Sequence, residues 1–446
     1  MTNSKLAIAM VLAAGGMMAA EAAFATNGYF QHGYGLKSKG MGGVATARAV
    51  DTFGGANNPA SMVWVGDRID FGADLFSPRR DSSRSGSSPL LGPIDGSADS
   101  DSKYFLIPEF GYNKMINPNL SLGVTVYGNG GMNTDYSGGQ IPAASFCGGI
   151  NPTPGTKNLL CGNGQLGVDL IQLVVAPTLA YKATPNHSFG VSPLIGFQRF
   201  RIEGAQGFAG FSTNQANLTN QGHDNAHGYG VRFGWFGRLS DSVSVGAAYS
   251  TKIYMSKFDK YKGLFAEQGD FDIPVNYNIG IAFKATPKLT VAADYQRINY
   301  SDVKSVGNPS SNLAGCFAGN PANCLGGSAG AGFGWRDISI IKIGFEYDYN
   351  QHWTWRAGYD HTQNPIRSSD VTINILAPGV VQDHLTLGLT HKTSRNGELT
   401  LSYMHAFNKS VTGPSFFNGF TAPLSSGNET IRMHQNAFGI AYGWKM

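Results

Sequence analysis

The feature that most restricts the fold is an alternation of apolar and polar residues, which recurs from about residue 66 to the C-terminus. In one segment Leu289, Val291 and Tyr295 occupy alternate positions, and polar residues such as Thr290 and Asp294 stand between them. Side chains of a β-strand point alternately to two faces, so a period of two predicts strands with one apolar and one polar face. Turn residues separate these segments, which indicates an all-β chain.

The alternating segments number fourteen, and single-chain bacterial barrels have an even number of strands. They are predicted at residues 66–78, 104–115, 119–130, 167–183, 187–204, 227–239, 242–257, 273–285, 288–303, 338–349, 352–363, 381–392, 396–409 and 432–446. Tight turns, such as Thr286-Pro287, alternate with longer connections, as short periplasmic turns alternate with long outer loops. The sequence therefore predicts a 14-stranded antiparallel transmembrane β-barrel over residues 66–446, in the outer membrane of a Gram-negative cell.

The hydropathy of the chain agrees with this interpretation. Mean hydropathy is −0.15, and no apolar run after residue 25 is long enough for a membrane helix. A closed barrel spans a bilayer at such hydropathy because only every second residue of a strand has to be apolar. A soluble β-sandwich also alternates, but it does not require aromatic residues near strand ends, such as Trp353, Trp355 and Tyr442.

The first 25 residues have the pattern of a secretory signal peptide. Lys5 precedes an apolar run from Leu6 to Ala20, and Ala23-Phe24-Ala25 fits the small-x-small cleavage rule. Cleavage is predicted before Thr26. A membrane anchor is the weaker interpretation, because the run is short for a span and no stop-transfer cluster follows it.

Residues 26–65 do not alternate and are rich in Gly and small residues. They are too long for a tail and too apolar for a disordered segment. A barrel of fourteen strands leaves a lumen, so we expect these residues to form a compact plug, or hatch, inside it. A periplasmic extension is the alternative.

Charge and cysteines restrict the possible partners. The net charge of +4 is spread along the chain without a basic stripe, which argues against nucleic acid as a partner. The four cysteines form two close pairs, and in an exported protein they indicate two loop disulfides, although three connectivities are possible. The pairs are Cys147 with Cys161 and Cys316 with Cys324. Neither pair is a CxxC and no His lies close by, so no metal site is predicted.

The chain carries a resemblance to a known family, which starts in the N-terminal segment and runs to the C-terminus. A Gly-rich opening, then Asn57-Asn58-Pro59-Ala60, then a first strand that contains residues 67–71 (DRIDF), resembles the hatch and first strand of the FadL/TodX family. Residues 352–358 (HWTWRAG) and 401–405 (LSYMH) are similar to family strands as well, whereas Met446 stands where barrels more often end in Phe. The resemblance implies a hatch that includes Asn58, Pro59 and Ala60, and uptake of hydrophobic compounds by diffusion without an energy source.

Transport of an apolar solute requires apolar residues in unusual places. Candidates for an outer capture groove lie in the loop after the third strand: Ile141, Phe146, Ile150, Leu159 and Leu160. A small loop core beside the disulfide is the equally simple interpretation. The third strand runs into three glycines, Gly128, Gly130 and Gly131, where a bulge or kink is permitted. In the family a kink in this strand makes a lateral opening, although an ordinary loop start is the alternative here.

The resemblance also implies residues for the binding pocket. Tyr29 and Phe30 lie near the mature N-terminus, where the family places an apolar side chain in the pocket, and Leu36 and Met41 extend that surface. The basic residues that resemble the family's are Arg199, Arg201 and Lys304. A cation exposed to lipid at mid-membrane is costly, so these three are expected to face the lumen or the interface. Binding of a carboxylate head group and pairing with acidic neighbours both account for them.

The predicted function is passive uptake of hydrophobic molecules, long-chain fatty acids first and aromatic or aliphatic hydrocarbons as the alternative. A general porin is disfavoured by the plug, and a hydrolase by the lack of GxSxG and HExxH motifs. An adhesin role of the loops would be secondary. The prediction includes no enzyme activity and no cofactor, and the partners are the solute, outer-membrane lipid and lipopolysaccharide around a monomer.

Overall fold

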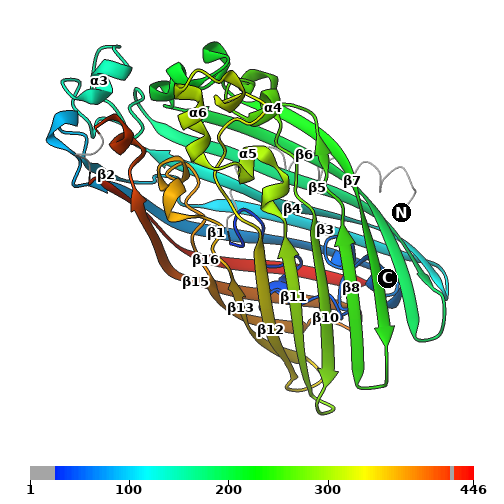
Figure 1. The fold of residues 1–446 in the computed structure, drawn as a ribbon. Coiled ribbons are helices and arrows are strands. Elements are labelled where there is room, and N and C mark those ends of the chain that lie inside the picture. The colour runs from blue at the N-terminus through cyan, green and yellow to red at the C-terminus, as the bar shows by residue number, and fades with distance from the viewer. Residues whose placement is uncertain (1–25, 422–425) are drawn as a thin grey trace.

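The computed structural model describes residues 26–421 and 426–446, and in it one antiparallel sheet closes on itself. Each strand pairs with its neighbours in the chain, and the last strand pairs with the first, from Arg68 opposite Lys445 to Ser85 opposite Asn428 (Figure 1). The described strands are β1 Arg68–Ser85, β2 Gly96–Asp99, β3 Phe105–Asn117, β4 Leu120–Tyr136, β5 Leu166–Lys182, β6 His187–Glu203, β7 Asp224–Arg238, β8 Val243–Ser250, β9 Tyr254–Met255, β10 Asn276–Lys284, β11 Leu289–Ile298, β12 Ile338–Asp348, β13 Trp353–Thr362, β14 Asp383–Lys392, β15 Gly397–Pro414 and β16 Asn428–Lys445. Without the short β2 and β9, which pair with β1 and β7 beyond the wall, fourteen of these sixteen form the barrel. The predicted fold is confirmed.

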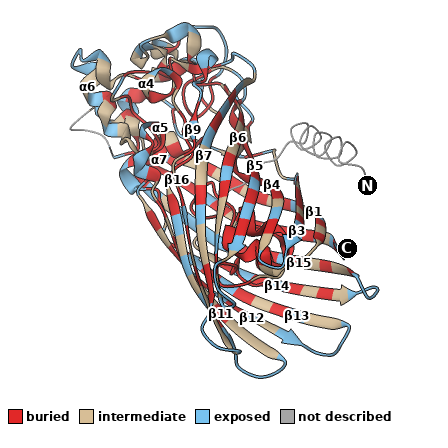
Figure 2. Cartoon of the chain, turned by 90° about the vertical axis from the view of Figure 1, so that its right-hand side faces the viewer, coloured by how far each residue is buried: buried red, intermediate tan, exposed pale blue. Residues whose placement is uncertain are grey.

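The two faces of each strand meet different surroundings. On β12, Ile341 is 61% exposed on the outside, whereas Lys342 is 5% exposed and points inward. Figure 2 shows the same alternation of buried and more exposed residues along the other wall strands. Large apolar side chains stand outside on every side of the barrel, including Phe71, Leu106, Leu122, Leu179, Phe189, Phe233, Ile279, Ile281, Leu385, Leu387, Phe438 and Ile440. Exposure of so much apolar surface to water would cost free energy, so we infer that lipid covers it.

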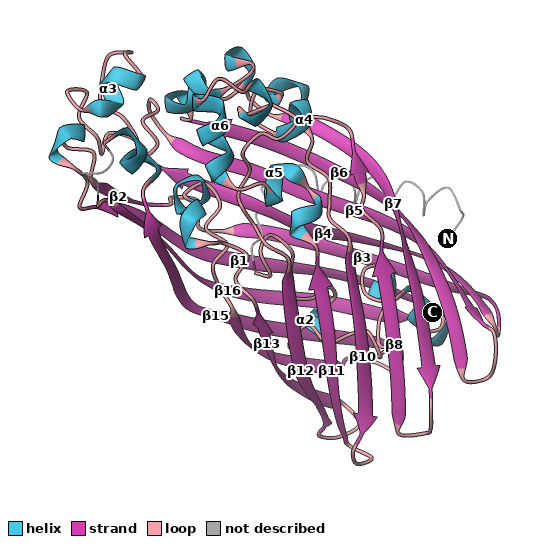
Figure 3. Ribbon diagram, viewed as in Figure 1, coloured by secondary structure: helices cyan, strands magenta, loops and turns pink. Residues whose placement is uncertain are grey.

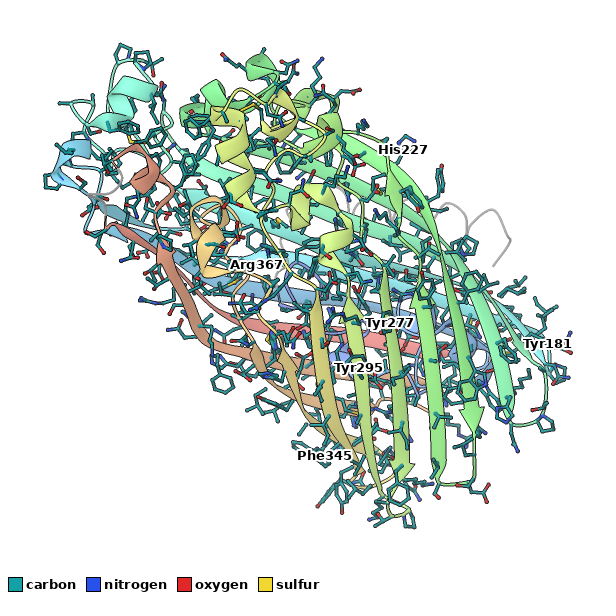
Figure 4. All side chains as sticks on the ribbon, in the orientation of Figure 1. Tyr181, His227, Tyr277, Tyr295, Phe345 and Arg367 are labelled. Atoms are coloured by element: carbon teal, nitrogen blue, oxygen red, sulfur yellow. A yellow bond between two sulfur atoms is a disulfide. The ribbon has the colours of Figure 1, made fainter. Side chains whose placement is uncertain are left out.

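The two ends of the barrel differ. One end carries the short turns, and the other carries long loops that hold most of the helices (Figure 3). In Figure 4, Tyr181 and Phe345 lie toward the end with the turns, and His227 and Arg367 lie toward the looped end. The loop helices are α3 Phe146–Ile150, α4 Ala266–Gly269, α5 Lys304–Gly307, α6 Leu313–Phe317 and α7 Val371–Asn374, with 3₁₀ turns η3 Pro89–Leu91, η4 Gln206–Phe211, η5 Gln215–Asn217, η6 Asp259–Tyr261, η7 Tyr300–Asp302, η8 Ser310–Asn312, η9 Pro321–Asn323, η10 Ser368–Asp370 and η11 Phe416–Phe420. No helix among the described residues is long and apolar enough to cross a membrane.

Strand ends differ from the predicted ones near the loops. β1 continues to Ser85, where the sequence indicated an end near residue 78, because its upper half still pairs with β16. Above the bilayer the outward face no longer has to be apolar, so the hydropathy pattern that located the strand disappears there. The ninth predicted segment, 288–303, ends at Ile298 and turns into η7 and α5.

Both predicted loop disulfides are present. Cys147 is bonded to Cys161 with 4.8 Å between their Cα atoms, and Cys316 to Cys324 with 4.7 Å. Both lie at the looped end, so each closes a loop on the outer side of the membrane.

Residues 26–65 lie inside the barrel and are mostly buried, as the hatch prediction requires. They form α2 Leu36–Lys39, η1 Phe53–Gly55 and η2 Pro59–Trp64. Buried ion pairs join the hatch to the wall: Lys39 Nζ lies 2.9 Å from an Asp74 carboxylate oxygen, Lys37 pairs with Glu398, and Arg48 pairs with Glu346. The hatch therefore closes the lumen with a polar surface, tied to strands on several sides of the barrel.

The Asn58-Pro59-Ala60 motif lies where the hatch touches the wall. The Asn58 amide donates to the carbonyl oxygens of Thr46 and Trp235, at 2.8 Å each, and its oxygen accepts from the Ala60 N–H. A Cβ atom at Gly234 on β7 would lie 2.1 Å from the Asn58 side-chain oxygen. Glycine is therefore required at this point of the wall, because any side chain would displace the motif.

Candidate functional site

A cluster of packed aromatic side chains, called the aromatic chamber below, lies between the hatch and the outer loops. Five buried side chains form it: Tyr29 and Phe30 from the hatch, and Phe271, Tyr300 and Trp335 from two loops. The ring centroid of Tyr29 lies 5.0 Å from that of Tyr300 and 5.8 Å from that of Trp335. The Tyr300 hydroxyl donates to the Asn27 carbonyl and accepts from the Tyr29 N–H, so a loop residue holds the start of the hatch in place. The five rings therefore form one continuous apolar cluster that joins the hatch to the outer loops.

A small cavity adjoins the chamber, and Trp335 lines both. Its other lining side chains are Phe76, Pro78, Arg80, Met132, Asn133, Ala377, Pro378 and Met433, together with Gly379. Most of this lining is apolar and comes from three parts of the wall and one loop. The lining includes Met132 and Met433, and Met side chains adapt to the shape of what they contact.

The wall beside the cavity is discontinuous. β3 pairs with β4 only between Phe110, opposite Val126, and Asn117, opposite Leu120. Above Phe110, β3 still pairs with β1, while β4 continues to Tyr136 and pairs with β5. No ladder pairing between β3 and the upper part of β4 exists among the described residues. A gap in the hydrogen-bonded wall therefore lies there, and the buried side chains of Phe105, Ile107 and Tyr127 stand beside it.

The predicted glycines stand where β4 leaves β3. The register of β4 against β5 shifts between Gly128 and Gly130, and the hatch pairs with β4 at that point. The Gly131 N–H donates to the Tyr29 carbonyl at 3.0 Å, and the Gln31 N–H donates to the Asn129 carbonyl at 3.3 Å. The hatch thus acts as a pairing partner for β4 where β3 has been left behind.

The capture-loop residues fall into two groups. Ile141, Leu159 and Leu160 are fully buried beneath the loop, as the loop-core interpretation has it, whereas Phe146 and Ile150 are partly exposed. The Phe146 ring lies 4.6 Å from that of Phe420, at the edge of an aromatic patch that four loops build. This outer patch consists of Phe146, Phe211, Phe317, Phe416 and Phe420.

Sequence reasoning missed four of the five residues of the outer patch. Phe317 is 51% exposed although its ring lies 4.5 Å from that of Phe211. Exposed aromatic patches mark interaction sites. The only signal in the sequence was the pair Phe416-Phe417 in a polar loop, and the contacts between loops could not be derived from it.

A double substitution tests the role of the outer patch. Replacing Phe317 and Phe420 by serine is expected to weaken the binding of a fluorescent long-chain fatty acid to the purified protein about tenfold, because two rings are removed from the contact surface. Tyr104→Ser, at an exposed loop position outside the patch, is the matched control. Unchanged binding in the double variant would exclude the patch as a capture site.

A model of one protein family matches residues 8–443, and its description is outer membrane protein transport protein (OMPP1/FadL/TodX). The chain belongs to the FadL/TodX family. It is thus an outer-membrane protein, and the resemblance in the sequence is confirmed. The long-chain fatty acid transport protein of Salmonella typhi is 23% identical over 439 residues, which cover 91% of this chain and 92% of that protein.

Solved structures of FadL/TodX proteins share the fold. The toluene transporter TodX of Pseudomonas putida superimposes with a TM-score of 0.66 at 18% identity, over 94% of this chain and 100% of that one. A FadL homologue of Pseudomonas aeruginosa gives a TM-score of 0.66 at 15% identity, over 94% and 99% of the two chains. The toluene transporter TbuX of Ralstonia pickettii gives 0.60 at 19% identity, over 93% and 99%.

Arg199 and Arg201 do not line the lumen of this FadL/TodX barrel. They alternate on β6 with Gln198 and Phe200, which are buried inside, so both arginines point outward. Arg199 lies 3.6 Å from Asp169, and Arg201 lies 3.3 Å from Glu203. Of the two predicted roles, the structure shows the pairing with acidic neighbours and places neither residue where it reaches a head group in the chamber.

Lys304, Leu36 and Met41 also lie away from the aromatic chamber. Lys304 begins α5, and its half-exposed ammonium group lies 2.7 Å from Glu267 of a neighbouring loop. Leu36 approaches the wall at Gly439, and Met41 packs with Val44 and two wall alanines. Leu36 and Met41 thus join the hatch to the wall, and only Tyr29 and Phe30 of the predicted apolar set lie in the chamber.

Proposed function

We propose that this chain is a passive channel that takes hydrophobic molecules into the cell through the outer membrane. A solute is captured at the outer patch, passes into the aromatic chamber and its cavity, and leaves sideways through the gap between β3 and β4. The observation that carries the proposal is the position of the gap: it opens the wall beside the apolar chamber, on the outer side of the hatch.

The energetics favour a sideways exit over passage through the hatch. Burial of each methylene group stabilises a bound chain by about 0.8 kcal/mol, and lipid offers nearly the same environment, so movement from chamber to bilayer requires little free energy. Passage downward would break the buried ion pairs at Lys37, Lys39 and Arg48, which is costly when one partner is left unpaired.

The substrates are proposed to be long-chain fatty acids, with aromatic or aliphatic hydrocarbons as the alternative. Related proteins include a long-chain fatty acid transport protein and toluene transporters, so the family alone does not separate the two classes. The proposal includes no catalytic step or cofactor. It treats residues 1–25, outside the described residues, as a signal peptide removed from a monomer that lipid and lipopolysaccharide surround.

A substitution at the gap tests the route. Ile107 stands on the part of β3 that has left β4, so Ile107→Trp is expected to narrow the gap and lower uptake of radiolabelled oleate and toluene several-fold, in a strain without its own channels for them. Binding of oleate to the purified variant should persist, because the chamber itself is unchanged.

Ile341→Trp, on the lipid face of β12, is the matched control and should leave uptake unchanged. Equal uptake in the Ile107 variant and the wild type would rule out the lateral route. No uptake of either compound by the wild-type chain would overturn the transport function itself.

A further inference from the structure

The outward face of β15, β16 and β1 changes from apolar to polar near the looped end. These three strands lie side by side where the wall closes (Figure 1). One row of exposed side chains across them is apolar: Tyr403, Phe438 and Leu75. Beyond this row, toward the loops, the outward positions of β1 and β16 are all polar. The row therefore marks the edge of the lipid-covered surface on this side of the barrel.

Four basic side chains lie just beyond this edge. Arg79 of β1 lies opposite His434 of β16, and Arg432 occupies the next outward position of β16. His405 of β15 lies one row below His434, opposite Asn436. Opposite and diagonal side chains on one face of an antiparallel pair are about 5–8 Å apart, so the two guanidinium groups can contact one bound anion.

The positive charge of this basic cluster is only partly matched. Arg432 lies 3.6 Å from Asp81, whereas Arg79 donates to the Tyr104 hydroxyl at 2.8 Å and pairs with no carboxylate among the described residues. Three other outward-facing arginines of the strands, also near the loops, each have a carboxylate within 3.6 Å. These pairs are Arg199 with Asp169, Arg201 with Glu203, and Arg297 with Asp337. Neighbouring cations repel one another, and an anion that hydrogen-bonds to both would stabilise the cluster.

The height of the basic cluster on the barrel indicates which anion reaches it. The cluster lies at the looped end, directly beyond the apolar row, and therefore in the head-group layer of the outer leaflet. Lipopolysaccharide forms this leaflet, and it carries phosphates on the sugars to which its acyl chains are attached. Arginine suits such groups because its planar guanidinium donates two parallel hydrogen bonds to phosphate oxygens.

We propose that Arg79 and Arg432 bind a phosphate of lipopolysaccharide, while the acyl chains of the same lipid lie along the apolar face below. His434, opposite Arg79, supplies a further N–H donor. The two arginines belong to the first and the last strand of the wall, so the bound lipid also joins β1 to β16 where the barrel closes. The inference goes beyond the proposed channel function and does not depend on it.

The test compares two lipids that differ only in phosphate. Binding of lipid A with two phosphates, and of the same lipid A after enzymatic removal of both, is measured by native mass spectrometry of the purified protein in detergent. The wild type is expected to prefer the phosphorylated lipid about tenfold, because charge-assisted hydrogen bonds form only with it. The double variant Arg79→Gln, Arg432→Gln is expected to lose this preference and to bind the dephosphorylated lipid as the wild type does.

Arg201→Gln is the matched control, because it removes an outward-facing arginine near the loops that already pairs with Glu203 at 3.3 Å. This control should keep the preference of the wild type. Replacement of Arg79 and Arg432 by lysine should keep part of it, because lysine retains the charge but not the paired donors. Folding of every variant is checked by heat-modifiable migration in gels. If the double glutamine variant does not fold, the single Arg79→Gln and Arg432→Gln variants decide by the same ratio of the two lipids.

Three results would overturn the inference. The wild type could bind both lipids equally, which would leave acyl-chain contact as the whole interaction. The glutamine variants could keep the preference, which would place the phosphate elsewhere on the barrel. Inorganic phosphate could bind as tightly as the phosphorylated lipid and displace it, which would show a site for free anions. We expect inorganic phosphate to displace little of the lipid, because the acyl chains add apolar contacts that the free ion lacks.

Discussion

Replacement of Glu398 by alanine is expected to make the channel leak ions and small hydrophilic molecules. Glu398 on β15 accepts from Lys37 of the hatch and from Arg68 of β1, and all three side chains are largely buried. Removal of the carboxylate leaves Lys37 buried without its partner, and breaking a buried pair in this way costs about 3–5 kcal/mol. The substitution therefore destabilises the attachment of the hatch and not the wall. Arg68 retains its pair with Asp70 at 2.7 Å, and the barrel strands retain their hydrogen-bonded ladders.

The leak is measured as single-channel conductance in planar bilayers and as sensitivity of cells to a large polar antibiotic. Glu203→Ala removes the acid of an exposed pair with Arg201, worth less than about 1 kcal/mol, and should behave as the wild type does. Conductance of Glu398→Ala no higher than that of the control would show that the ion pair does not hold the hatch.

The second large effect is expected from Gly130→Ala, a change of one methyl group. The added Cβ would lie 1.9 Å from the Tyr29 carbonyl oxygen, which is far inside van der Waals contact. To relieve the clash, the start of the hatch has to move away from β4, and the Gly131-to-Tyr29 hydrogen bond of 3.0 Å is lost. Tyr29 and Phe30 then leave their places in the aromatic chamber. Uptake of both oleate and toluene should fall at least about tenfold, because the shared apolar site is disturbed.

Gly149→Ala provides the comparison for the same chemical change. A Cβ at Gly149 meets no atom of the described residues within 4 Å, so uptake by this variant should equal that of the wild type. Folding of both variants is checked by heat-modifiable migration. A folded Gly130→Ala barrel with normal uptake would mean that the pairing of hatch and β4 is dispensable for transport.

The strands could be predicted because the face of each strand that contacts lipid has to be apolar. Within the bilayer, every second residue of β6 is apolar on the outside, as at Phe189 and Phe197. Beyond Phe197 the polarity of the two faces reverses. Phe200 and Ile202 point inward under the loops, and Arg199 and Arg201 point outward. The resemblance to a basic stretch carried no information about this change in polarity, so both arginines were expected to face the lumen or the interface.

The positions of the predicted glycines follow from the local sequence. Gly128, Gly130 and Gly131 lie at the start of the gap, because consecutive glycines in a strand favour irregular pairing wherever they occur. The extent of the gap and the outer patch could not be found in this way. The gap arises from missing pairs between β3 and β4, and Phe146 meets Phe420 only because loops distant in the sequence fold over one another.

The enclosed hatch restricts the order in which the molecule assembles. It contacts β1, β12, β15 and β16 among other wall strands, so we expect that a folded hatch enters the lumen only while the wall is still open. The wall closes along β1 and β16, whose pairing spans the full length of both strands. We therefore expect the hatch to be in place before β1 pairs with β16. The N-terminal segment then serves as a core around which the barrel assembles, as well as its plug.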